Sequence, residues 1–373
     1  MKNSFSHSPM PMFLAVLVIA CSAISWSRVA VAKHVNVYNW NHYIGENVLS
    51  DFEKTTGIRV IYDLVDSNQV LEGKLLAGQS GYDVVVSSAD FMARQIKAGI
   101  YLPLDKTQLA DFSQLDPMLM TALGELDPNN QYGVPYMWGT TGIGFNRSKV
   151  LEVLGEDAPL DSWELVFNPQ NLAKLSTCGV AFLDSPTDIF PLVLNYLGLP
   201  THSNNPKNYQ GQAKQLLMRL APHITYFHSS KYIDDLATGE ICVVVGWSGD
   251  ILQAKISAAS AAQPQTIEYI IPKEGALMWV DMLGIPSDAK NPQEALAFIK
   301  FMMRPDIAAR NTNDIWYANP ITASRPMTLP IIANDTAIYP TKAQRENLFP
   351  ARPINPRVDR VINRAWTEIL TGQ

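Results

Sequence analysis

The chain has 373 residues, of which 47% are hydrophobic and 17% are charged, a composition typical of folded globular proteins and not of disordered or low-complexity chains. It carries 29 Lys and Arg against 35 Asp and Glu, a formal net charge of −6. This acidic balance makes nucleic acid and anionic membrane surfaces poor partners. The length suits two or so domains of roughly 100–200 residues.

An apolar run near the N-terminus predicts an export signal. Residues 12–21 (MFLAVLVIAC) follow Lys2 and are too few to span a bilayer, which needs about 20 apolar residues. Small residues at 30–32 (AVA) then suit cleavage, so residues 1–32 are predicted to be a signal peptide. Lipidation at Cys21 after a lipoprotein-type cleavage is the main alternative, and an uncleaved anchor is the third.

Two further cysteines, Cys178 and Cys242, remain in the body of the chain. An exported chain with an even number of cysteines favours a disulfide between them. Such a bridge would stabilise the fold by about 4 kcal/mol at most. The alternative is a pair of unrelated buried thiols.

The first part of the body alternates between short apolar strands and amphipathic helices. The predicted elements, in chain order, are a strand at 34–40, a helix at 46–56, a strand at 59–64, a helix at 67–78, a strand at 83–87 and a helix at 91–98. This order predicts a mostly parallel sheet with helices on both faces.

The pattern changes at residues 132–145, where Gly, Pro and β-formers mix as in strands that cross between two lobes. A second α/β block runs from Lys149 to about Gln265. Two predicted strands, 267–272 and 278–285, and a helix at 292–303 then return to the pattern of the first block.

We therefore predict an α/β fold of two discontinuous lobes. Each lobe is a mainly parallel sheet with helices on both faces, and crossing strands join the lobes. Lobe 1 would comprise residues 33–135 and 267–305, and lobe 2 residues 136–266 and 306–373.

Local motifs of common enzyme classes do not occur in the sequence. It has no HExxH motif, no Walker loop and no histidine–cysteine cluster at metal-ligand spacing, so no metal or cofactor is predicted. Gly142-Ile143-Gly144 lacks the third glycine of a dinucleotide fingerprint. A hydrolase triad built by tertiary proximity remains an alternative.

Aromatic residues stand beside acidic or small polar residues where several predicted strands end. These residues are Trp40 and Tyr43, Ser88 and Asp90, Trp247 and Asp250, Trp279 and Asp281, and Tyr317. Ligands of open parallel sheets bind beyond the carboxyl ends of the strands, so these segments are expected to converge. Rings and carboxylates together suit a polyamine, because each ammonium donates to carboxylates and is attracted to a ring face by ~0.5–2 kcal/mol.

Other interpretations of the same residues stay open. A single tryptophan is more often part of a core than a ligand contact. Asp90 and Asp250 are also typical of helix caps, and His42 of a solvated or capping histidine. Asp281 differs, since an acid among apolar strand residues needs a buried partner.

Several segments carry a family resemblance that covers residues 35–372. They are YNWNHYIGENVLSDFEKTTGIRV, DSNQVLEGKLLAGQSGYDVVVSSADF, PYMWGTTGIGFN, FHSSKYIDDLATGEICVVVGWSGD, IPKEGALMWVDMLGIP and WYANP. The chain resembles the periplasmic substrate-binding proteins of bacterial polyamine ABC transporters, above all the putrescine-binding branch. The resemblance implies a periplasmic, monomeric, two-lobed protein without catalysis that closes on its ligand and docks to a membrane permease. A polyamine sensor that signals to a membrane receptor is the alternative role, and a polyamine-modifying enzyme is a further one.

The resemblance also implies the ligand-binding residues and a disulfide. The implied ligand set is Trp40, Asn41, Tyr43, Ser88, Asp188, Trp247, Asp250, Trp279, Asp281 and Tyr317, and Cys178 and Cys242 match the disulfide of the putrescine branch.

Three positions depart from the family pattern. Relatives carry Ser or Thr and then an acid where this chain has Asn41 and His42, so one amine-binding acid is missing. Asp90 stands where relatives have Ser or Tyr, and we predict that it replaces the lost charge. The overall sequence favours putrescine as the ligand, whereas Trp279 resembles the spermidine-preferring branch and makes spermidine the alternative.

Overall fold

The computed structural model describes Met1 and residues 33–109, 112–261 and 264–372. The contacts divide the chain into two units, Met1–Ala32 and Lys33–Gln373, and all elements below belong to the second. The predicted signal peptide over residues 1–32 and the alternative at Cys21 lie outside the described residues, apart from Met1.

Across the described residues, ten strands form one sheet in the order β2-β1-β3-β9-β4-β7-β5-β6, with β10 beside β9 and β8 beside β4. The strands are β1 (His34–Trp40), β2 (Arg59–Val65), β3 (Val84–Ser88), β4 (Gly133–Asn146), β5 (Val180–Phe182), β6 (Tyr226–Phe227), β7 (Val243–Trp247), β8 (Ile267–Ile270), β9 (Leu277–Gly284) and β10 (Phe349–Pro350).

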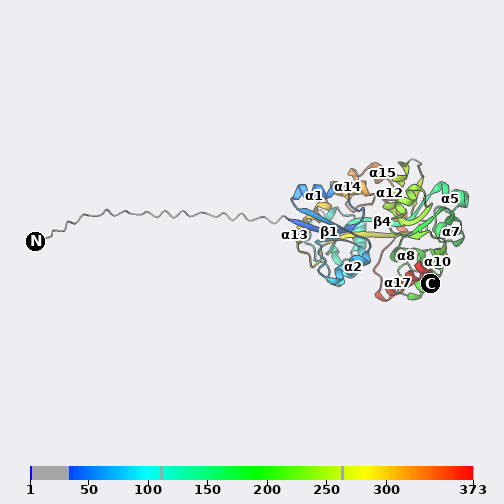
Figure 1. Cartoon of the computed structure of the whole chain (residues 1–373), viewed down its shortest axis with the longest axis horizontal. Helices are drawn as coiled ribbons and strands as arrows, with labels where there is room; N and C mark the ends of the chain where they lie inside the picture. Colours follow the sequence, from blue (N-terminus) through cyan, green and yellow to red (C-terminus); the bar gives the residue numbers. More distant parts are fainter. Residues whose placement is uncertain (2–32, 110–111, 262–263, 373) are drawn as a thin grey trace. The chain divides into compact units, whose positions relative to one another are not determined.

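The sheet is parallel towards both ends and antiparallel in the middle. β1 pairs in parallel with β2 and β3, and β5 pairs in parallel with β6 and β7. The long strand β4 pairs antiparallel with β9, β7 and β8, and β9 pairs antiparallel with β3. β4 and β9 are therefore the crossing strands that link the two parallel parts of the sheet (Figure 1).

Helices cover the sheet. Those of the first half and middle are α1 (Val48–Thr56), α2 (Asn68–Ala77), α3 (Ala89–Lys97), α4 (Pro117–Leu123), α5 (Arg147–Leu154), α6 (Glu164–Phe167), α7 (Pro169–Leu175), α8 (Pro186–Tyr196) and α9 (Pro206–Asn208). The others are α10 (Lys214–Leu220), α11 (Tyr232–Thr238), α12 (Ser248–Ala259), α13 (Pro292–Met302), α14 (Pro305–Ile315), α15 (Pro330–Ala333), α16 (Lys342–Glu346) and α17 (Pro356–Thr371).

Local sequence explains where several helices begin and end. The Ser67 hydroxyl accepts a hydrogen bond from the Val70 amide and caps α2, and Gly57 ends α1 at a φ of 70° that favours glycine. The predicted helix at 46–56 begins at Val48 instead, because Asn47 takes a left-handed conformation. The helix predicted from residue 91 begins earlier, at Ala89, directly after β3.

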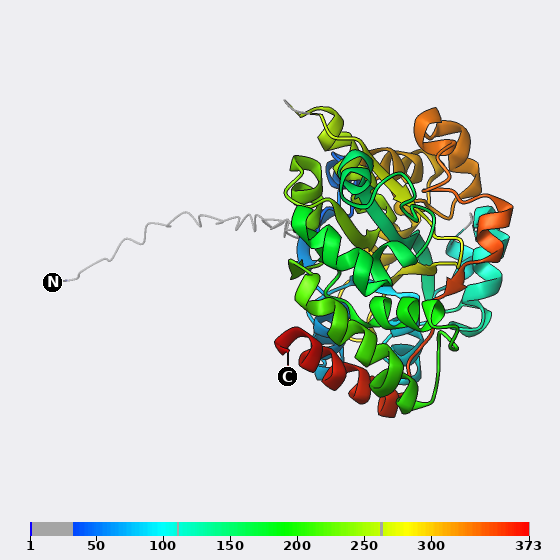
Figure 2. The ribbon, with the colours of Figure 1, turned by 90° about the vertical axis from the view of Figure 1, so that its right-hand side faces the viewer.

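Buried apolar side chains form separate clusters towards the two ends of the sheet. One cluster joins β5 and β7 to α7, α8, α10 and α17. Figure 2 shows α17, in red, running beside the green helices, and its Trp366 contacts Phe190 of α8 with ring centroids 6.2 Å apart. A second cluster joins β1 and β3 to α1, α13 and α14.

The disulfide predicted from the sequence is confirmed. Cys178 and Cys242 are bonded across 64 residues of chain, with their Cα atoms 5.5 Å apart. Each cysteine lies just before one of two paired parallel strands, because Val180 of β5 is aligned with Val243 of β7. Among the described residues, no helix is both long and apolar enough to cross a membrane.

Candidate ligand-binding site

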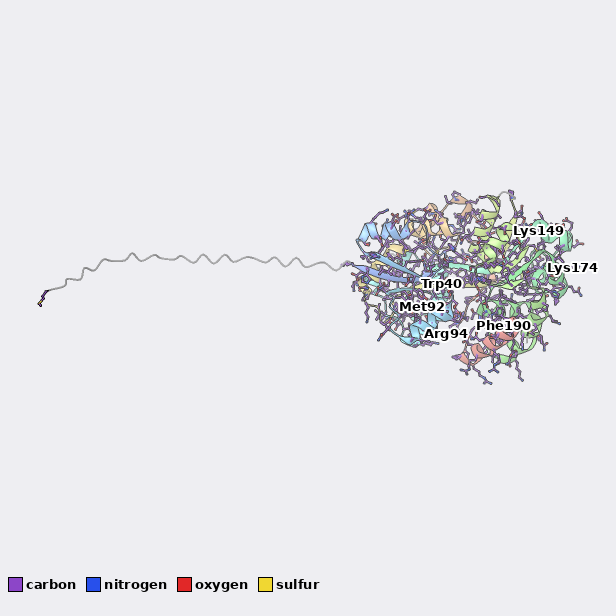
Figure 3. All side chains as sticks on the ribbon, in the orientation of Figure 1. Trp40, Met92, Arg94, Lys149, Lys174 and Phe190 are labelled. Atoms are coloured by element: carbon purple, nitrogen blue, oxygen red, sulfur yellow. A yellow bond between two sulfur atoms is a disulfide. The ribbon has the colours of Figure 1, made fainter. Side chains whose placement is uncertain are left out.

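Residues distant in the sequence meet where β1, β3 and β7 end beside the crossing strand β9. Trp40 ends β1 and lies near the middle of the body in Figure 3. Ser88 ends β3 and Trp247 ends β7, and each is followed directly by a helix, α3 or α12. Asp281 of β9 is aligned with Ser88 in the antiparallel β3–β9 pair. The strand ends therefore carry the predicted residues to one region.

Asp281 is only 5% exposed and lies among hydrogen-bond donors. The Ser88 hydroxyl donates to its Oδ1 at 2.7 Å. Burial, together with the nearby charge of Asp188, raises the pKa of Asp281 to about 6. The hydrogen bond from the Ser88 hydroxyl opposes this rise. Asp281 thus has the buried partners that its place in an apolar strand requires.

Asp250 lies between two tyrosine hydroxyls. Tyr232 donates to Oδ2 at 2.7 Å and Tyr317 donates to Oδ1 at 2.5 Å. The backbone N–H of Asp250 donates to the Tyr317 hydroxyl in return, at 3.2 Å. Burial raises the pKa of Asp250 to about 6, while the two tyrosines and the charge of His42 lower it. These contacts orient the carboxylate without neutralising it.

Asp188, in the first turn of α8, accepts hydrogen bonds from residues of β4, β7 and the start of its own helix. Its Oδ1 accepts hydrogen bonds from the Thr141 hydroxyl at 2.7 Å and the Trp247 indole at 3.2 Å. Its Oδ2 accepts from the Ser185 hydroxyl at 2.5 Å. Burial raises the pKa of Asp188 in spite of these donors. The bond to Trp247 makes this acid and this ring a pair.

Asp90, in the first turn of α3, is 8% exposed. Burial raises its pKa to about 7, and the nearby charge of Asp188 adds to the rise. Arg94 and the backbone amides of Asp90 and Phe91 oppose it. Amides of its own first turn lie close to its carboxylate, but the N-cap residue of α3 is Ser88, and the charge of Asp188 places Asp90 beside the other acids. The interpretation of Asp90 as a helix cap is therefore wrong, and its role at the ligand site stays a prediction.

Aromatic rings pack edge to face beside these carboxylates. The Tyr317 ring lies 5.3 Å from that of Tyr43 and 5.4 Å from that of Trp279, measured between centroids. Tyr43 in turn contacts Tyr136 at 5.6 Å, and the Tyr136 hydroxyl donates to the Tyr43 carbonyl. The indole Nε1 of Trp279 is buried and has no hydrogen-bond partner among the described residues. The rings of Tyr43, Tyr317 and Trp279 thus form a continuous series from the loop after β1 to β9.

No basic side chain in the described part of the chain forms an ion pair with Asp90, Asp188, Asp250 or Asp281. The nearest candidate, Arg94, instead binds Glu72 through two hydrogen bonds of 2.6 and 2.7 Å. Several carboxylates close together in a poorly solvated region raise the free energy of the folded protein unless a cation binds among them. Chemically, this arrangement can hold an organic cation with apolar parts between its charges.

Two residues after the end of β1 are more exposed than the acids of this group. Asn41 and His42 are exposed in the turn after β1, and His42 has a φ of 51°. Sequence reasoning did not single out Thr141, Ser185 or Tyr232, which orient Asp188 and Asp250. Their positions inside a strand and at helix starts carry no local sign of this role, because only tertiary packing brings them to the acids.

Comparisons with known proteins show which proteins this chain is similar to. The family described as bacterial extracellular solute-binding protein matches residues 47–340. The putrescine-binding periplasmic protein SpuD of Pseudomonas aeruginosa (strain UCBPP-PA14) is 48% identical over 360 residues, which cover 96% of this chain and 98% of that protein. The putrescine-binding periplasmic protein PotF of Escherichia coli (strain K12) is 46% identical over 355 residues, which cover 95% and 96%.

A solved structure shows the same fold. The protein described as a putative spermidine/putrescine ABC transporter from Listeria monocytogenes superposes with a TM-score of 0.81 at 29% identity, covering 91% of this chain and 100% of that one. The two-lobed α/β architecture expected from the sequence is therefore confirmed, and the chain is an exported binding protein and not an enzyme. Together, the match over residues 47–340 and the full-length relatives establish that this chain belongs to the bacterial extracellular solute-binding protein family.

Proposed function

We propose that this protein binds a polyamine, putrescine first and spermidine as the alternative, and delivers it to the membrane permease of an ABC uptake system. The single observation that carries the proposal is the group of carboxylates, Asp188, Asp250 and Asp281, which stand beside aromatic rings without a basic partner among the described residues. Each ammonium of a diamine supplies the missing charge, and its methylene groups lie against the rings.

The names of the relatives support the same ligand class. Two relatives that are 46% and 48% identical are named as putrescine-binding proteins, and both matches run over nearly the whole chain. The residues that depart from the family pattern, His42, Asp90 and Trp279, leave the preferred polyamine to be measured.

Ligand capture in this proposal is a closure of two lobes about the crossing strands β4 and β9. The sequence places the lobes at 33–135 with 267–305 and at 136–266 with 306–373. The apolar cluster of β1, β3 and α13 also includes Ile307, Ile315 and Ile321. We therefore assign the segment after α13, through Ile321, to the first lobe in this proposal. Asp188 and Asp250 would then approach Asp281 from the second lobe.

Calorimetry of the purified mature protein tests the proposal. We expect putrescine to bind with micromolar or tighter affinity, about −8 kcal/mol or better, and spermidine and cadaverine to bind as well. 1-Butylamine, which carries one amine, and 1,4-butanediol, which carries none, are the matched controls and should bind far more weakly. If none of the three polyamines produces heat of binding, the polyamine assignment is wrong.

Export by the predicted signal peptide belongs to the same proposal. Cleavage after Ala32 yields a mature chain that begins at Lys33, and lipidation would instead leave Cys21 as the first residue. Mass spectrometry of the mature N-terminus distinguishes these products. We further propose that the mature protein acts as a monomer, which gel filtration with light scattering checks.

A further inference from the structure

Three exposed arginines, which we call the arginine row, lie along the outer side of α17. Arg357, Arg360 and Arg364 follow the spacing of three and four residues that places side chains on one side of a helix. The opposite side of α17 is buried, and the indole of its Trp366 donates to Asp184 at 2.8 Å. Figure 2 shows α17, in red, at the surface of the body.

The charges of the arginine row contribute no ion pair to the fold among the described residues. Arg360 and Arg364 are four residues apart, a spacing at which like charges repel each other along a helix. Arg357 lies in the first turn of α17, where the positive end of the helix dipole disfavours a cation. The reason for the row therefore lies outside the contacts that this chain makes with itself.

Neighbouring helices extend the positive charge around the arginine row. Both α9 and α10 pack against α17. The segments 206–220 and 356–372 contain only two acids, Asp359 and Glu368, and Glu368 is paired with Lys214. The same segments contain six basic residues, Lys207, Lys214, Arg219, Arg357, Arg360 and Arg364. This part of the molecule is therefore positive, whereas the whole chain has a formal net charge of −6.

The first turns of α17 lie at the junction between the two proposed lobes. Ile354, just before the helix, and Ile362 within it line a small pocket together with Asp90 of α3. By the lobe boundaries proposed above, Asp90 belongs to the first lobe and α17 to the second. A partner that binds the arginine row therefore has both lobes within reach, as a partner that must distinguish the open from the closed protein requires.

We propose that the arginine row docks to an acidic periplasmic surface of the membrane permease. The inference rests on the proposed function, which requires such a partner. A guanidinium group binds a carboxylate through two parallel hydrogen bonds. The row is about 10 Å long at 1.5 Å per residue, so it matches two or three Asp or Glu side chains of the permease.

An anionic membrane surface fits the arginine row less well. Helices that bind in a membrane interface insert an apolar side into the lipid. The apolar side of α17 is buried in the fold, and Leu370 is its only large apolar residue among those exposed in the described chain. The acidic remainder of the protein would also be repelled by anionic lipid.

Proteoliposomes of neutral phosphatidylcholine that contain the protein's own permease and ATPase subunits test the docking. The row variant combines Arg357→Gln, Arg360→Gln and Arg364→Gln. The control variant replaces three exposed lysines of other helices that form no ion pair in the described chain, Lys97→Gln, Lys255→Gln and Lys300→Gln. With saturating putrescine, we expect the row variant to need a roughly 3- to 100-fold higher concentration for half-maximal ATPase stimulation, because each exposed ion pair contributes about 1.5- to 5-fold. The control variant should match the wild type.

Three further measurements separate docking from folding and from ligand binding. In calorimetry, the row variant should bind putrescine within about twofold of the wild type. In thermal scans it should melt no lower than the wild type, because the substitutions remove charges that do not stabilise α17. Raising NaCl from about 50 to about 300 mM should weaken docking of the wild type more than docking of the row variant.

The other outcomes contradict the inference in distinguishable ways. Docking of the row variant at the wild-type concentration, or an equal loss in the control variant, overturns the docking surface while the proposed function stands. A lower melting temperature or weaker putrescine binding in the row variant assigns the row a structural role and also overturns it. Binding to phosphatidylglycerol vesicles without the permease, if it is lost in the row variant, assigns the row to lipid headgroups instead. Failure of the wild type to bind putrescine overturns the proposed function itself.

Discussion

At the scale of single residues, the carboxylate of Asp281 shows most clearly why the proposed site would bind a cation. It is buried, faces Ser88 across a strand pair and has no basic partner among the described residues. In the absence of ligand, its raised pKa shows that the fold does not stabilise its charge. An ammonium group that binds beside Asp281 supplies the opposite charge and lowers the free energy of the buried carboxylate.

Replacement of Asp281 by Asn therefore removes a charge and keeps the shape. We predict that Asp281→Asn weakens putrescine binding by roughly 2–5 kcal/mol, as expected when one partner of a buried charge pair is lost. Calorimetry measures the change, with Asp157→Asn as the control for net charge. A dissociation constant within a factor of two of wild type would remove Asp281 from the ligand set.

At the scale of elements, the contact between β4 and β9 positions the Trp279 ring. Gly139 of β4 is aligned with Trp279 of β9. A Cβ at residue 139 would lie 2.7 Å from the indole Cζ2 and 2.9 Å from the Ser248 hydroxyl. The absence of a side chain at Gly139 is thus what allows the indole to lie so close to β4.

We predict that Gly139→Ala displaces the Trp279 ring and weakens polyamine binding. Overpacking of this kind destabilises a fold by about 1–3 kcal/mol, so a lower melting temperature should accompany the loss of affinity. Gly73→Ala is the matched control, since nothing lies within 4 Å of its added Cβ. This control should be neutral or stabilise α2 by up to about 1 kcal/mol. Wild-type affinity in Gly139→Ala would show that the indole position does not matter for binding.

At the scale of the whole molecule, the acids near the proposed site link ligand binding to pH. The pKa values of Asp250 and Asp281 are raised to about 6 and that of Asp90 to about 7, each from 3.8. The folded state therefore holds these protons more tightly than the unfolded state. Their contribution to stability is present at low pH and is lost as the pH rises through about 6–7.

We predict that these acids lower the melting temperature of the ligand-free protein between about pH 4 and pH 7, and that affinity for putrescine rises over the same interval. A bound dication favours the ionised acids, so saturating putrescine should reduce the slope. Thermal scans with and without putrescine at several pH values measure both effects. The double variant Asp250→Asn with Asp281→Asn should lose most of the slope, and an unchanged slope would contradict this origin.

The parts of the fold and of the site that depend on residues close in the sequence could be predicted, whereas the parts that depend on distant residues could not. The strand at 34–40 and the cap at Ser67 follow from local patterns, and the structure agrees with both. Asp281 and Ser88 are 193 residues apart in the sequence, and their pairing depends on the register between β3 and β9. Local sequence patterns do not encode this register. Tyr232 likewise lies on a helix that only packing brings to Asp250.

One strand, β4, contributes to buried cores at both of its ends. Val134 near its start packs in the cluster of β1 and α13, whereas Ile143 and Phe145 near its end pack in the cluster of β5 and α17. Unfolding of either core removes apolar packing contacts from the same continuous strand, β4. Heat unfolding should consequently appear in scanning calorimetry as a single cooperative transition, with van't Hoff and calorimetric enthalpies in agreement.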